Sequence, residues 1–394
     1  MKTKEKTKKM KYDFIVLGAD GMQGTIVAKY LLKKGYKVLC TDIVHSRIKD
    51  IVEQYKTLGA FQIIDLRDTD RLVGAIQKSG ADVVINCAEG NWNLNVYQAC
   101  LDTHRHCIDL GSRLDMTADQ LKLHKSFKKI GKTAITGCGS VPGIGNIMLA
   151  HVAKKMDSIE SIDAGFAWDS NIKKFVVPFS IESILEEYTL KAPYIQSRRL
   201  RRMRPEESTK MRTFRSIGHQ KIFLADHPEI HTFFHYFKSW GVQNIRFYAG
   251  FPEHSERVIK NLVDLTFSDS SAVQFEGKEI NPDSFLGQLL KRVPIPKGYK
   301  EWENLWVEVT GRSNRKKKTI LMECLVPPLK EWEEAGCNID TGFPAAVIAE
   351  MIKYGDINKF GSFAPEAIVP EKPFFKALKK HKFVFYENGE KLRV

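Results

Sequence analysis

At 394 residues the chain is long enough for two domains and a substantial core, and its 43% hydrophobic content is typical of a globular protein. No apolar run approaches the roughly 20 residues that cross a bilayer, and seven scattered cysteines without a CxxC pair favour reduced thiols and a cytoplasmic setting. Residues 1–11, 198–215 and 312–318 carry net charges of +5, +6 and +5, and the rest of the chain carries −2, which gives the formal net charge of +14. These three segments lack the interleaved aromatics of a nucleic-acid surface.

The basic stretch 1–11 has no apolar run behind it before Phe14, so we expect a solvated tail and not a secretory signal. Residues Asp13–Asp42 then predict a strand, a glycine turn, a helix and a second strand. Gly18, Gly21 and Gly24 follow the first strand with GxxGxxG spacing, and Met22 opens the helix. This order is typical of a dinucleotide-binding turn, with the pyrophosphate at the helix N-terminus.

Asp42 ends the second predicted strand, 24 residues after Gly18. An acid at that distance is placed to bond both hydroxyls of an adenosine ribose. Its charge would repel a 2′-phosphate, so we expect NAD as the cofactor. NADP stays open because His45 and Arg47 lie close by in the sequence.

The strand–helix unit then recurs through residues 12–145, and it predicts an α/β fold with a doubly wound parallel sheet. One connecting helix is expected at Thr117–Ile130, with Thr117 and Gln120 as a capping box. Ligands bind at the carboxyl ends of such strands, so we place Asp65 and Leu66 at the adenine, and Cys87 and Ala88 where the pyrophosphate and nicotinamide ribose pass. The predicted strands are Asp13–Leu17, Lys37–Thr41, Phe61–Ile64, Asp82–Asn86, His106–Asp109 and Thr133–Thr136.

From about residue 150 longer, mixed pieces predict a second, α+β domain at residues 146–340, which would hold the substrate and the contacts of a homodimer. Arg198–Arg215 is expected to be a polar loop, and the final helix, Pro344–Tyr354, to return to the first domain within the segment 341–394. The expected strands are Ile159–Ala167, Phe175–Phe179, Val242–Tyr248 and a hairpin of Asn304–Thr310 with Thr319–Val326 across a basic loop; the expected helices are Ser180–Tyr188, Glu229–Ser239 and Glu256–Leu262.

Dispersed motifs carry a resemblance to a known family: VLGADGMQG, CIDLGS at Cys107–Ser112, GCGSVPGIGN at Gly137–Asn146, SIESILEEYT at Ser180–Thr189, IRFYAGFPE at Ile245–Glu253, and TGFPAAVIAEMIKYGDINKFGSFAPE at Thr341–Glu366. In this order they resemble the saccharopine dehydrogenase family, and most of all its lysine 6-dehydrogenase-like members. Saccharopine-processing relatives usually have an aspartate before the proline-glycine where this chain has Val141, which favours a free amine as the substrate. The arginine-rich segment is not a recognised feature of either group.

The resemblance implies reversible oxidation of a CH–NH or CH–NH2 group of an amino acid, with hydride passing to NAD(P). Arg246, in IRFYAGF, matches an arginine of saccharopine-type relatives and is the expected carboxylate anchor; an exposed strand position is the alternative. Asp109 is expected to hold the amine or accept its proton, with helix capping left open. Tyr188, with Glu187 beside it, comes from the helix that the resemblance puts over the cleft, and Cys138 is expected to line the nicotinamide pocket.

Two other functions stay open from the sequence. The first is a carboxynorspermidine-type polyamine reductase, and the second is a non-catalytic, dinucleotide-sensing protein whose basic loops contact a polyanion. His227, His231 and His235 recur every four residues, but no HExxH is formed, so we expect partly exposed histidines and no metal. We expect a small amino-acid or polyamine substrate, with no membrane or nucleic-acid partner.

Overall fold

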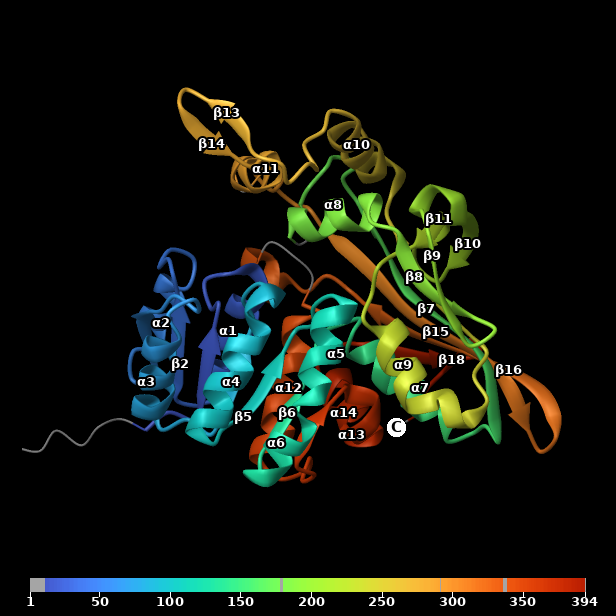
Figure 1. Cartoon of the computed structure of the whole chain (residues 1–394), viewed down its shortest axis with the longest axis horizontal. Coiled ribbons are helices and arrows are strands. Elements are labelled where there is room, and N and C mark those ends of the chain that lie inside the picture. Colours follow the sequence, from blue (N-terminus) through green and yellow to red (C-terminus); the bar gives the residue numbers. More distant parts are fainter. Residues whose placement is uncertain (1–10, 178–179, 291, 336–338, 394) are drawn as a thin grey trace, which may run out of the picture.

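The computed structural model of the chain describes residues 11–177, 180–290, 292–335 and 339–393 (Figure 1). Nearly all of the predicted basic tail, residues 1–10, lies outside the described residues. Among the helices of the described part, none is long and apolar enough to cross a membrane.

A seven-stranded parallel sheet organises the first part of the chain, with the strand order β17-β6-β5-β4-β1-β2-β3. The sequence predicted six of these strands, and the seventh, β17, comes from far along the chain and pairs with β6. The doubly wound α/β fold is therefore confirmed. The strands are β1 (Phe14–Leu17), β2 (Val38–Asp42), β3 (Gly59–Ile63), β4 (Val83–Asn86), β5 (His106–Asp109), β6 (Thr133–Ile135) and β17 (Gly361–Phe363).

Helices cover both faces of this sheet because its strands are apolar on both sides. In β1, Phe14 and Val16 pack in the cluster that contains α1 (Met22–Lys33) and α12 (Gly342–Lys353). Ile15 and Leu17 pack in a second cluster with α3 (Thr69–Ser79) and α4 (Asn93–Thr103). A short α2 (Lys49–Gln54) precedes β3.

The single helix expected at Thr117–Ile130 is wrong. The structure has α5 (Leu114–Lys122) and α6 (His124–Lys129), with a break at Leu123. Arg113 occupies the position before α5, so Thr117 lies inside the helix and caps nothing. Gln120 turns inward, where its amide donates to the carboxylate of Asp109 at 2.7 Å.

A mixed sheet forms the second layer and confirms the α+β part of the prediction (Figure 1, right). Strands β12 and β7 run parallel at its centre, and the other strand pairs in the described part of this sheet are antiparallel. The order is β10-β11-β12-β7-β15-β16-β18-β19, with β8 paired to β12 and β9. The bounds are β7 (Ser158–Ser170), β8 (Ala192–Gln196), β9 (Arg199–Met203), β10 (Lys210–Phe214), β11 (Gly218–Leu224), β12 (Asn244–Gly250), β15 (Glu301–Ser313), β16 (Lys316–Val326), β18 (Val384–Glu387) and β19 (Glu390–Lys391).

Both basic segments of this part were wrongly predicted as loops. The hairpin of β15 and β16 is confirmed, but it pairs up to Ser313 and Lys316, so most of the basic residues extend the strands. The arginine-rich segment forms β9, the 3₁₀ turn η2 (Pro205–Ser208) and β10. Beyond β10, Arg215 lies 3.5 Å from Glu323.

Strand β10 lies across the outer face of the mixed sheet. Lys210 lies 3.7 Å from Asp163 of β7, and Arg212 lies 3.2 Å from Glu308 of β15. The partners lie on successive strands of the sheet, and the Arg212 guanidinium also covers the Trp306 ring at 4.0 Å. Alternate residues of β10 therefore bind the sheet beneath, which is the period-2 pattern of a strand and not that of a loop.

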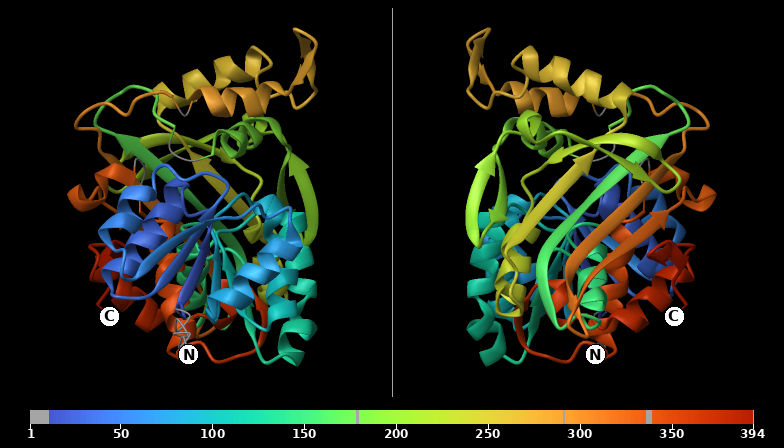
Figure 2. Two further views of the ribbon diagram at one scale, coloured as in Figure 1. Left: turned by 90° about the vertical axis from the view of Figure 1, so that its left-hand side faces the viewer. Right: turned by 90° about the vertical axis from the view of Figure 1, so that its right-hand side faces the viewer.

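A third layer of helices lies beyond the two sheets (Figure 2). It contains α8 (Ile181–Thr189), α10 (Glu253–Asp264), the hairpin of β13 (Val273–Phe275) and β14 (Lys278–Ile280), and α11 (Pro282–Leu290). The predicted helix at Ser180–Tyr188 is confirmed as α8, and the Ser180 hydroxyl caps it by accepting a hydrogen bond from the Ser183 amide. Residues 175–177, half of a predicted strand, are not in a strand, and 178–179 lie outside the described residues.

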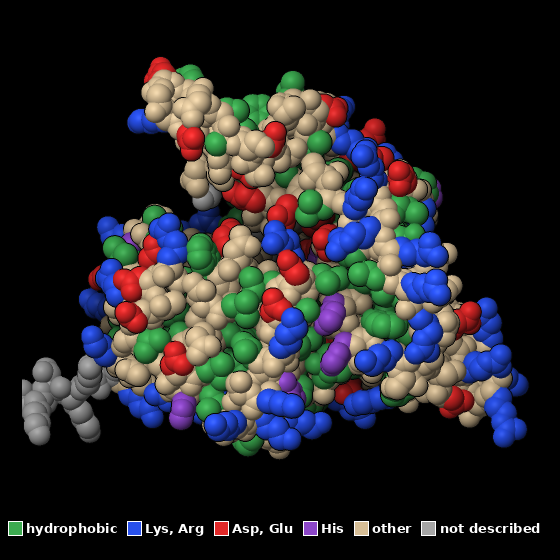
Figure 3. Space-filling view, viewed as in Figure 1, with side chains coloured by type: hydrophobic (Ala, Val, Ile, Leu, Met, Phe, Trp, Pro, Cys, Tyr) green, Lys and Arg blue, Asp and Glu red, His purple; other side chains and the backbone are tan. Residues whose placement is uncertain are grey.

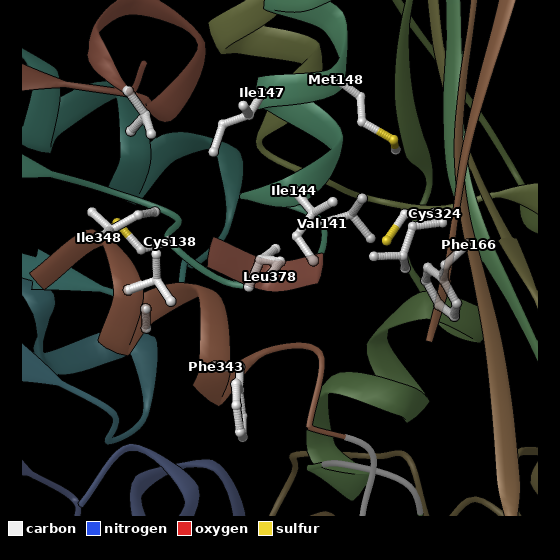
Figure 4. Packing of buried hydrophobic residues seen from close by; sticks show 14 of the residues in the cluster. Cys138, Val141, Ile144, Ile147, Met148, Phe166, Cys324, Phe343, Ile348 and Leu378 are labelled. Atoms are coloured by element: carbon white, nitrogen blue, oxygen red, sulfur yellow. The ribbon is translucent and has the colours of Figure 1, made fainter. Parts of the chain in front are cut away.

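One hydrophobic core joins the two sheets (Figure 4). It runs from Phe343 and Ile348 of α12 through Ile144 of α7 (Ile144–Ala153) to Phe166 of β7. The segment 341–394 contributes to both halves, since β17 joins the first sheet and β18 the second. Pro344–Tyr354 is not the last helix, because α13 (Pro365–Ile368) and α14 (Glu371–Lys379) follow it. The remaining elements are α9 (Glu229–Phe237), η1 (Gly90–Trp92), η3 (Lys238–Trp240) and η4 (Lys330–Ala335).

Candidate active site

A cleft of about 370 Å³ lies between the carboxyl ends of the parallel sheet and the second half of the chain. Its first wall comes from the loops that follow β4, β5 and β6, at residues 89–91, 110–113 and 140–142. Its second wall comes from α8, residues 226–228 and the inner face of the mixed sheet. Figure 3 shows the hollow beneath the projecting third layer.

The glycine turn at the first wall has the shape that a dinucleotide requires. Gly18 has φ +71°, and a Cβ there would lie 2.5 Å from the Ala88 nitrogen. A Cβ on Gly24 would lie 1.9 Å from the Gly18 oxygen, so helix and turn are in direct contact. No side chain caps α1, and its first turn contains no acid, which leaves its N-terminus open to a pyrophosphate. Gly18, Gly21, Met22, Gly24 and Ala88 therefore fit a nicotinamide dinucleotide.

Asp42 lies where a ribose would sit, at the end of β2. Its Oδ2 accepts from the Asp20 amide at 2.9 Å, and its Oδ1 accepts from the Ile43 amide. Asp20 stands where the commoner motif has a second glycine, and its carboxylate accepts from the amides of Ser46 and Ile48. The departure from the usual motif therefore positions the loop after β2.

The other cofactor candidates lie near this wall in different environments. Asp65 is bound by Arg67, whose hydrogen bonds lower the pKa of the carboxyl to about 2. The Leu66 side chain is buried in the second core cluster, so its backbone is what borders the adenine position. The Cys87 amide donates to Leu17 at 2.8 Å, next to the glycine turn, and burial raises the pKa of its thiol.

Asp109 does not line the cleft. It is fully buried, and its carboxylate accepts hydrogen bonds from the Tyr97 hydroxyl at 2.9 Å, Gln120 at 2.7 Å and the amides of Gly111 and Gly137 at 2.7 and 2.9 Å. Burial raises its pKa and these donors oppose the rise. Asp109 therefore positions the cleft-lining loops after β5 and β6, and the geometry gives no support to proton transfer at the substrate.

Arg246 lies on the opposite face of the mixed sheet from the cleft. Its Nη1 is 3.3 Å from Asp163 Oδ1 on that outer face. The neighbouring Phe247 points to the inner face, where its ring stacks on that of His227 at 3.7 Å. Successive residues of a strand point to opposite sides. The arginine is therefore not placed to hold a substrate in this cleft.

Tyr188 also points away from the cleft. Its ring packs on Phe223 and Phe251, and its buried hydroxyl has no partner among the described residues. The preceding residue, Glu187, lines the cleft instead. One helical position, about 100° around the axis, separates the predicted residue from the one that faces the site. Cys138 is fully buried and is likewise absent from the cleft lining.

The cleft is strongly acidic although the whole chain is basic. Figure 3 shows acidic side chains gathered around the hollow and basic ones over the opposite side of the molecule. Among the described residues, one arginine and one histidine, Arg113 and His227, face eight carboxyl side chains across it. The eight are Glu89, Glu182, Glu186, Glu187, Asp226, Glu301, Glu303 and Asp340.

Several of these carboxyls hold protons more tightly than usual. Burial raises the pKa of Glu187 to about 7, and it also raises those of Glu186 and Asp226. Glu303 and Asp340 are hydrogen-bonded to each other, and burial followed by the neighbouring acid raises the pKa of Glu303 well above its ordinary value. Two carboxyls so close share one proton. Burial thus favours the protonated, neutral forms of these carboxyls, and a cation in the cleft would favour their ionised forms.

His227 recurs in the sequence at four-residue spacing with His231 and His235, but it does not lie on their helix. It precedes α9, whereas the other two lie on the helix with their rings 6.1 Å apart. His227 Nδ1 is 3.1 Å from Glu229, and its Nε2 is 4.0 Å from Glu187. In the described ranges no group of three possible ligands could hold a metal ion.

Sequence reasoning missed most of the second wall. Glu301 and Glu303 are spaced by two, so as members of a strand they share a face, which was a usable signal. Asp226, Asp340 and Thr341 come from loops far apart in the chain, and nothing local connects them. On the first wall, Ser112 ends the CIDLGS motif and Arg113 follows it, so the motif indicated this loop but not its role in the cleft.

The comparisons with known proteins agree with this geometry. The model of the saccharopine dehydrogenase NADP binding domain matches residues 14–135, and that of the saccharopine dehydrogenase C-terminal domain matches residues 139–384. The chain is 23% identical to carboxyaminopropylagmatine dehydrogenase of Synechocystis sp., with 92% of this chain and 94% of the relative aligned. It is 23% identical to carboxynorspermidine synthase of Vibrio cholerae, with 86% and 85% aligned.

A solved structure shows the same fold over nearly the whole length. Apo saccharopine dehydrogenase (L-Glu forming) from Saccharomyces cerevisiae superposes with a TM-score of 0.71 at 12% identity, and the match covers 97% of this chain and 100% of that one. The two family models match most of the described chain, and the glycine turn fits the cofactor that the first of them names. The chain belongs to the saccharopine dehydrogenase family of NAD(P)-binding oxidoreductases.

Proposed function

We propose that this protein is an NAD-dependent oxidoreductase that oxidises the CH–NH group of a carboxylated polyamine to an imine, or reduces the imine back to the amine. The observation that carries the proposal is the excess of carboxyl groups in the cleft, eight against one arginine and one histidine among the described residues. Bound nicotinamide dinucleotide supplies or accepts the hydride, and the residues of the chain select and orient the amine.

Electrostatics favours a substrate with several spaced ammonium groups. Without a guest, burial is the largest cause of the raised pKa values of Glu187 and Glu303, and repulsion from a neighbouring acid, Glu186 or Asp340, raises each of them further. Each cation that enters relieves this repulsion and gains a charge-assisted hydrogen bond worth roughly 1.5–3 kcal/mol. A substrate with three carboxylates against two ammonium groups, such as saccharopine, would bring a net negative charge and leave most of these acids without a counter-charge.

The two walls suggest how such a substrate lies. Glu301, Glu303 and Asp340 form one acidic end, and Glu186, Glu187 and Asp226 form the other, next to α9. We assign the role of carboxylate anchor to Arg113, which lines the cleft and makes only loose contacts, 3.7 Å to Asp115 and 3.6 Å to Glu186. In this arrangement Arg113 takes the role that we predicted for Arg246 from the sequence.

The names of two relatives support this assignment over oxidation of an amino acid. They describe carboxylated derivatives of agmatine and norspermidine, which are both polycationic amines. Lysine stays the second candidate because it also brings an ammonium group, and Val141 before Pro142 was the sequence feature that favoured a free amine.

The test is an assay of reduced-nicotinamide absorbance with carboxynorspermidine, saccharopine, lysine and unmodified polyamines in turn. We expect the carboxylated polyamine to have the highest kcat/KM, and its KM to rise several-fold between low and high salt because ion pairs hold it. The double variant Glu303→Gln with Asp340→Asn should raise this KM at least tenfold. Glu308→Gln, on the outer face of the same strand, is the matched control. Faster turnover of saccharopine, or a KM that is insensitive to these changes, would contradict the proposal.

A further inference from the structure

A chain of three buried ionisable side chains runs from the cleft into the second half of the molecule. Glu187 comes from α8, His227 from the loop before α9, and Glu229 from the first turn of α9. Glu187 and Glu229 are 7% and 1% exposed, and the His227 side chain is 14% exposed. Glu187 and His227 line the cleft, whereas Glu229 does not, so the chain begins at the site and ends in the core.

The histidine is fixed on two sides. Its ring stacks on Phe247 with centroids 3.7 Å apart and planes at 9°, and Glu229 Oε2 contacts its Nδ1 at 3.1 Å. With Nδ1 bound to Glu229, Nε2 is directed toward Glu187 Oε1, 4.0 Å away. Burial lowers the pKa of His227, but the neighbouring charges of Glu229 and Glu187 outweigh it and raise the value.

Glu187 has one oxygen beside this imidazole and one that is unengaged. Its Oε2 is buried and has no hydrogen-bond partner among the described residues. A buried carboxyl oxygen with no partner is costly, and its place in the cleft lining gives a substrate group the chance to satisfy it. Loops after β5 and β6, where the nicotinamide end of a dinucleotide belongs, form the wall opposite.

The other charged groups around Glu187 have separate partners. Glu186, on the same helix, lies 3.6 Å from Arg113 of the loop after β5. Asp226, in the loop before α9, lies 3.9 Å from Arg202 of β9. Glu186 raises the pKa of Glu187 and His227 lowers it, but burial is the largest cause of its value of about 7.

We propose that Glu187 is the general base that takes the proton from the reacting nitrogen, and that His227, held by Glu229, is the positioning residue that sets its basicity. The inference rests on the proposed CH–NH chemistry. In the oxidative direction, the Glu187 carboxylate removes one proton from the secondary ammonium of the substrate. The nitrogen lone pair then forms the C=N bond as hydride leaves the adjacent carbon for the oxidised nicotinamide, which leaves an iminium ion. In reduction, Glu187 returns the proton to the amine product.

Glu187→Gln keeps the size and hydrogen-bonding capacity of the side chain but removes the base. We expect kcat to fall by roughly 10²–10⁴-fold, as for loss of a general base, while cofactor affinity changes by less than about fivefold and the KM of the amine rises far less than kcat falls. Glu187→Asp should recover part of kcat. Glu253→Gln, at an exposed position of α10, is the matched control.

The pH profile separates this role from a merely structural one. The base must be ionised, so the oxidation rate should rise with pH through about 7 and the reduction rate should fall there. His227→Gln should shift the pH dependence of both the oxidation and the reduction rate upward by about one pH unit, since a positive neighbour no longer favours the Glu187 carboxylate. An infrared titration without substrate gives a second readout. Buried carboxyl C=O absorption should disappear as pH rises through about 7; the part that belongs to Glu187 should be missing in Glu187→Gln and should titrate at higher pH in His227→Gln, while the part that belongs to Glu366 remains in both variants.

The outcomes distinguish this inference from the proposed function. If Glu187→Gln retains wild-type kcat on whichever amine is oxidised, or if its pH limb is unchanged, the assignment of Glu187 is overturned and the CH–NH chemistry stands. If saccharopine or lysine is the substrate instead, the polyamine proposal fails while the same variants still test Glu187. If no CH–NH donor is turned over, both fail.

Discussion

Glu366 shows how a single buried carboxyl can support the site from behind. Its Oε2 accepts from Asn146 Nδ2 at 2.7 Å, and Asn146 Oδ1 accepts from the Gly143 amide at 2.8 Å. The carboxyl thus stabilises the turn at residues 141–143, whose first two members line the cleft. Burial raises the pKa of Glu366 to about 7, with nearby Glu229 adding to the rise and the bonds from Thr232 and Asn146 opposing it.

This raised pKa makes stability depend on pH. Between about 4.5 and 7 the folded protein holds one proton at Glu366 that the unfolded chain has lost, so this contribution to stability is complete below 4.5 and lost as pH rises through 7. Glu366→Gln keeps an acceptor for Asn146 and does not ionise. Its free energy of unfolding relative to wild type should therefore increase from pH 5 to pH 8, by at most about 3 kcal/mol. Denaturant titrations at both values measure it, and an equal difference at the two would contradict the role.

Asp42 is the residue at which cofactor choice is decided in our proposal. Asp42→Asn removes the charge and retains an acceptor for the Asp20 amide, so it separates selectivity from loop structure. We expect NAD affinity to fall about tenfold or more, as a charge-assisted bond to the ribose weakens, and NADP affinity to rise. Calorimetry with both dinucleotides measures this. Unchanged NADP affinity in Asp42→Asn and Asp42→Ala would assign the selectivity to another residue.

At the scale of elements, contacts between backbones decide where helices and strands can lie. Helix α1 approaches the glycine turn so closely that Gly24 has no room for a side chain. Strand β10 shows the opposite case, in which long basic side chains bridge a strand to the sheet below it through Asp163 and Glu308.

Two helical glycines give a matched pair of variants. Gly24→Ala places a Cβ 1.9 Å from the Gly18 oxygen, so turn and helix must separate. We expect weaker dinucleotide binding and a loss of about 2 kcal/mol or more in unfolding free energy. Gly74→Ala in α3 meets nothing within 4 Å and should stabilise the protein by up to about 1 kcal/mol. Thermal unfolding of both variants with and without NAD measures these effects. A Gly24→Ala variant that unfolds and binds NAD like the wild type would show that the close contact is not needed at the site.

At the scale of the whole molecule, the two sheets depend on a common interior. Phe343 of α12 is fully buried against Tyr30 and Trp332, with ring centroids 5.0 and 4.8 Å away, and belongs to the cluster that reaches the mixed sheet (Figure 4). The cleft between the sheets is fixed by this shared core and not by a flexible linker.

Phe343→Ala should therefore destabilise both halves together. We expect a loss of about 3–5 kcal/mol, the usual cost of removing a buried phenylalanine. Far-ultraviolet circular dichroism and tryptophan fluorescence should report the same lowered midpoint, since Trp168 and Trp306 are buried in the mixed sheet. Two separate unfolding transitions, or different midpoints from the two probes, would show that the halves unfold independently.

The sequence by itself determined the parallel sheet, the glycine turn with Asp42, and the family, because these depend on local periodicity and short motifs. It also placed α8 and the hairpin of β15 and β16. It did not determine which side chains face the cleft. Arg246 points away from the cleft side of its strand, whereas the next residue, Phe247, stacks there on His227. Tyr188 also points away, whereas the preceding residue, Glu187, lines the cleft. Local patterns fix what an element is, but its rotation about its own axis depends on what packs against it.

Tertiary structure alone decided the character of the site. The carboxyls of the cleft come from segments as distant as Glu89 and Asp340, and their shared proton and raised pKa values arise from burial side by side. In the sequence as a whole, the 61 lysines and arginines outnumber the 47 acids, so the chain is basic overall. The cleft becomes acidic only when folding brings these carboxyls together and removes the water between them. Their proximity depends on contacts between residues far apart in the chain, which local sequence patterns do not reveal.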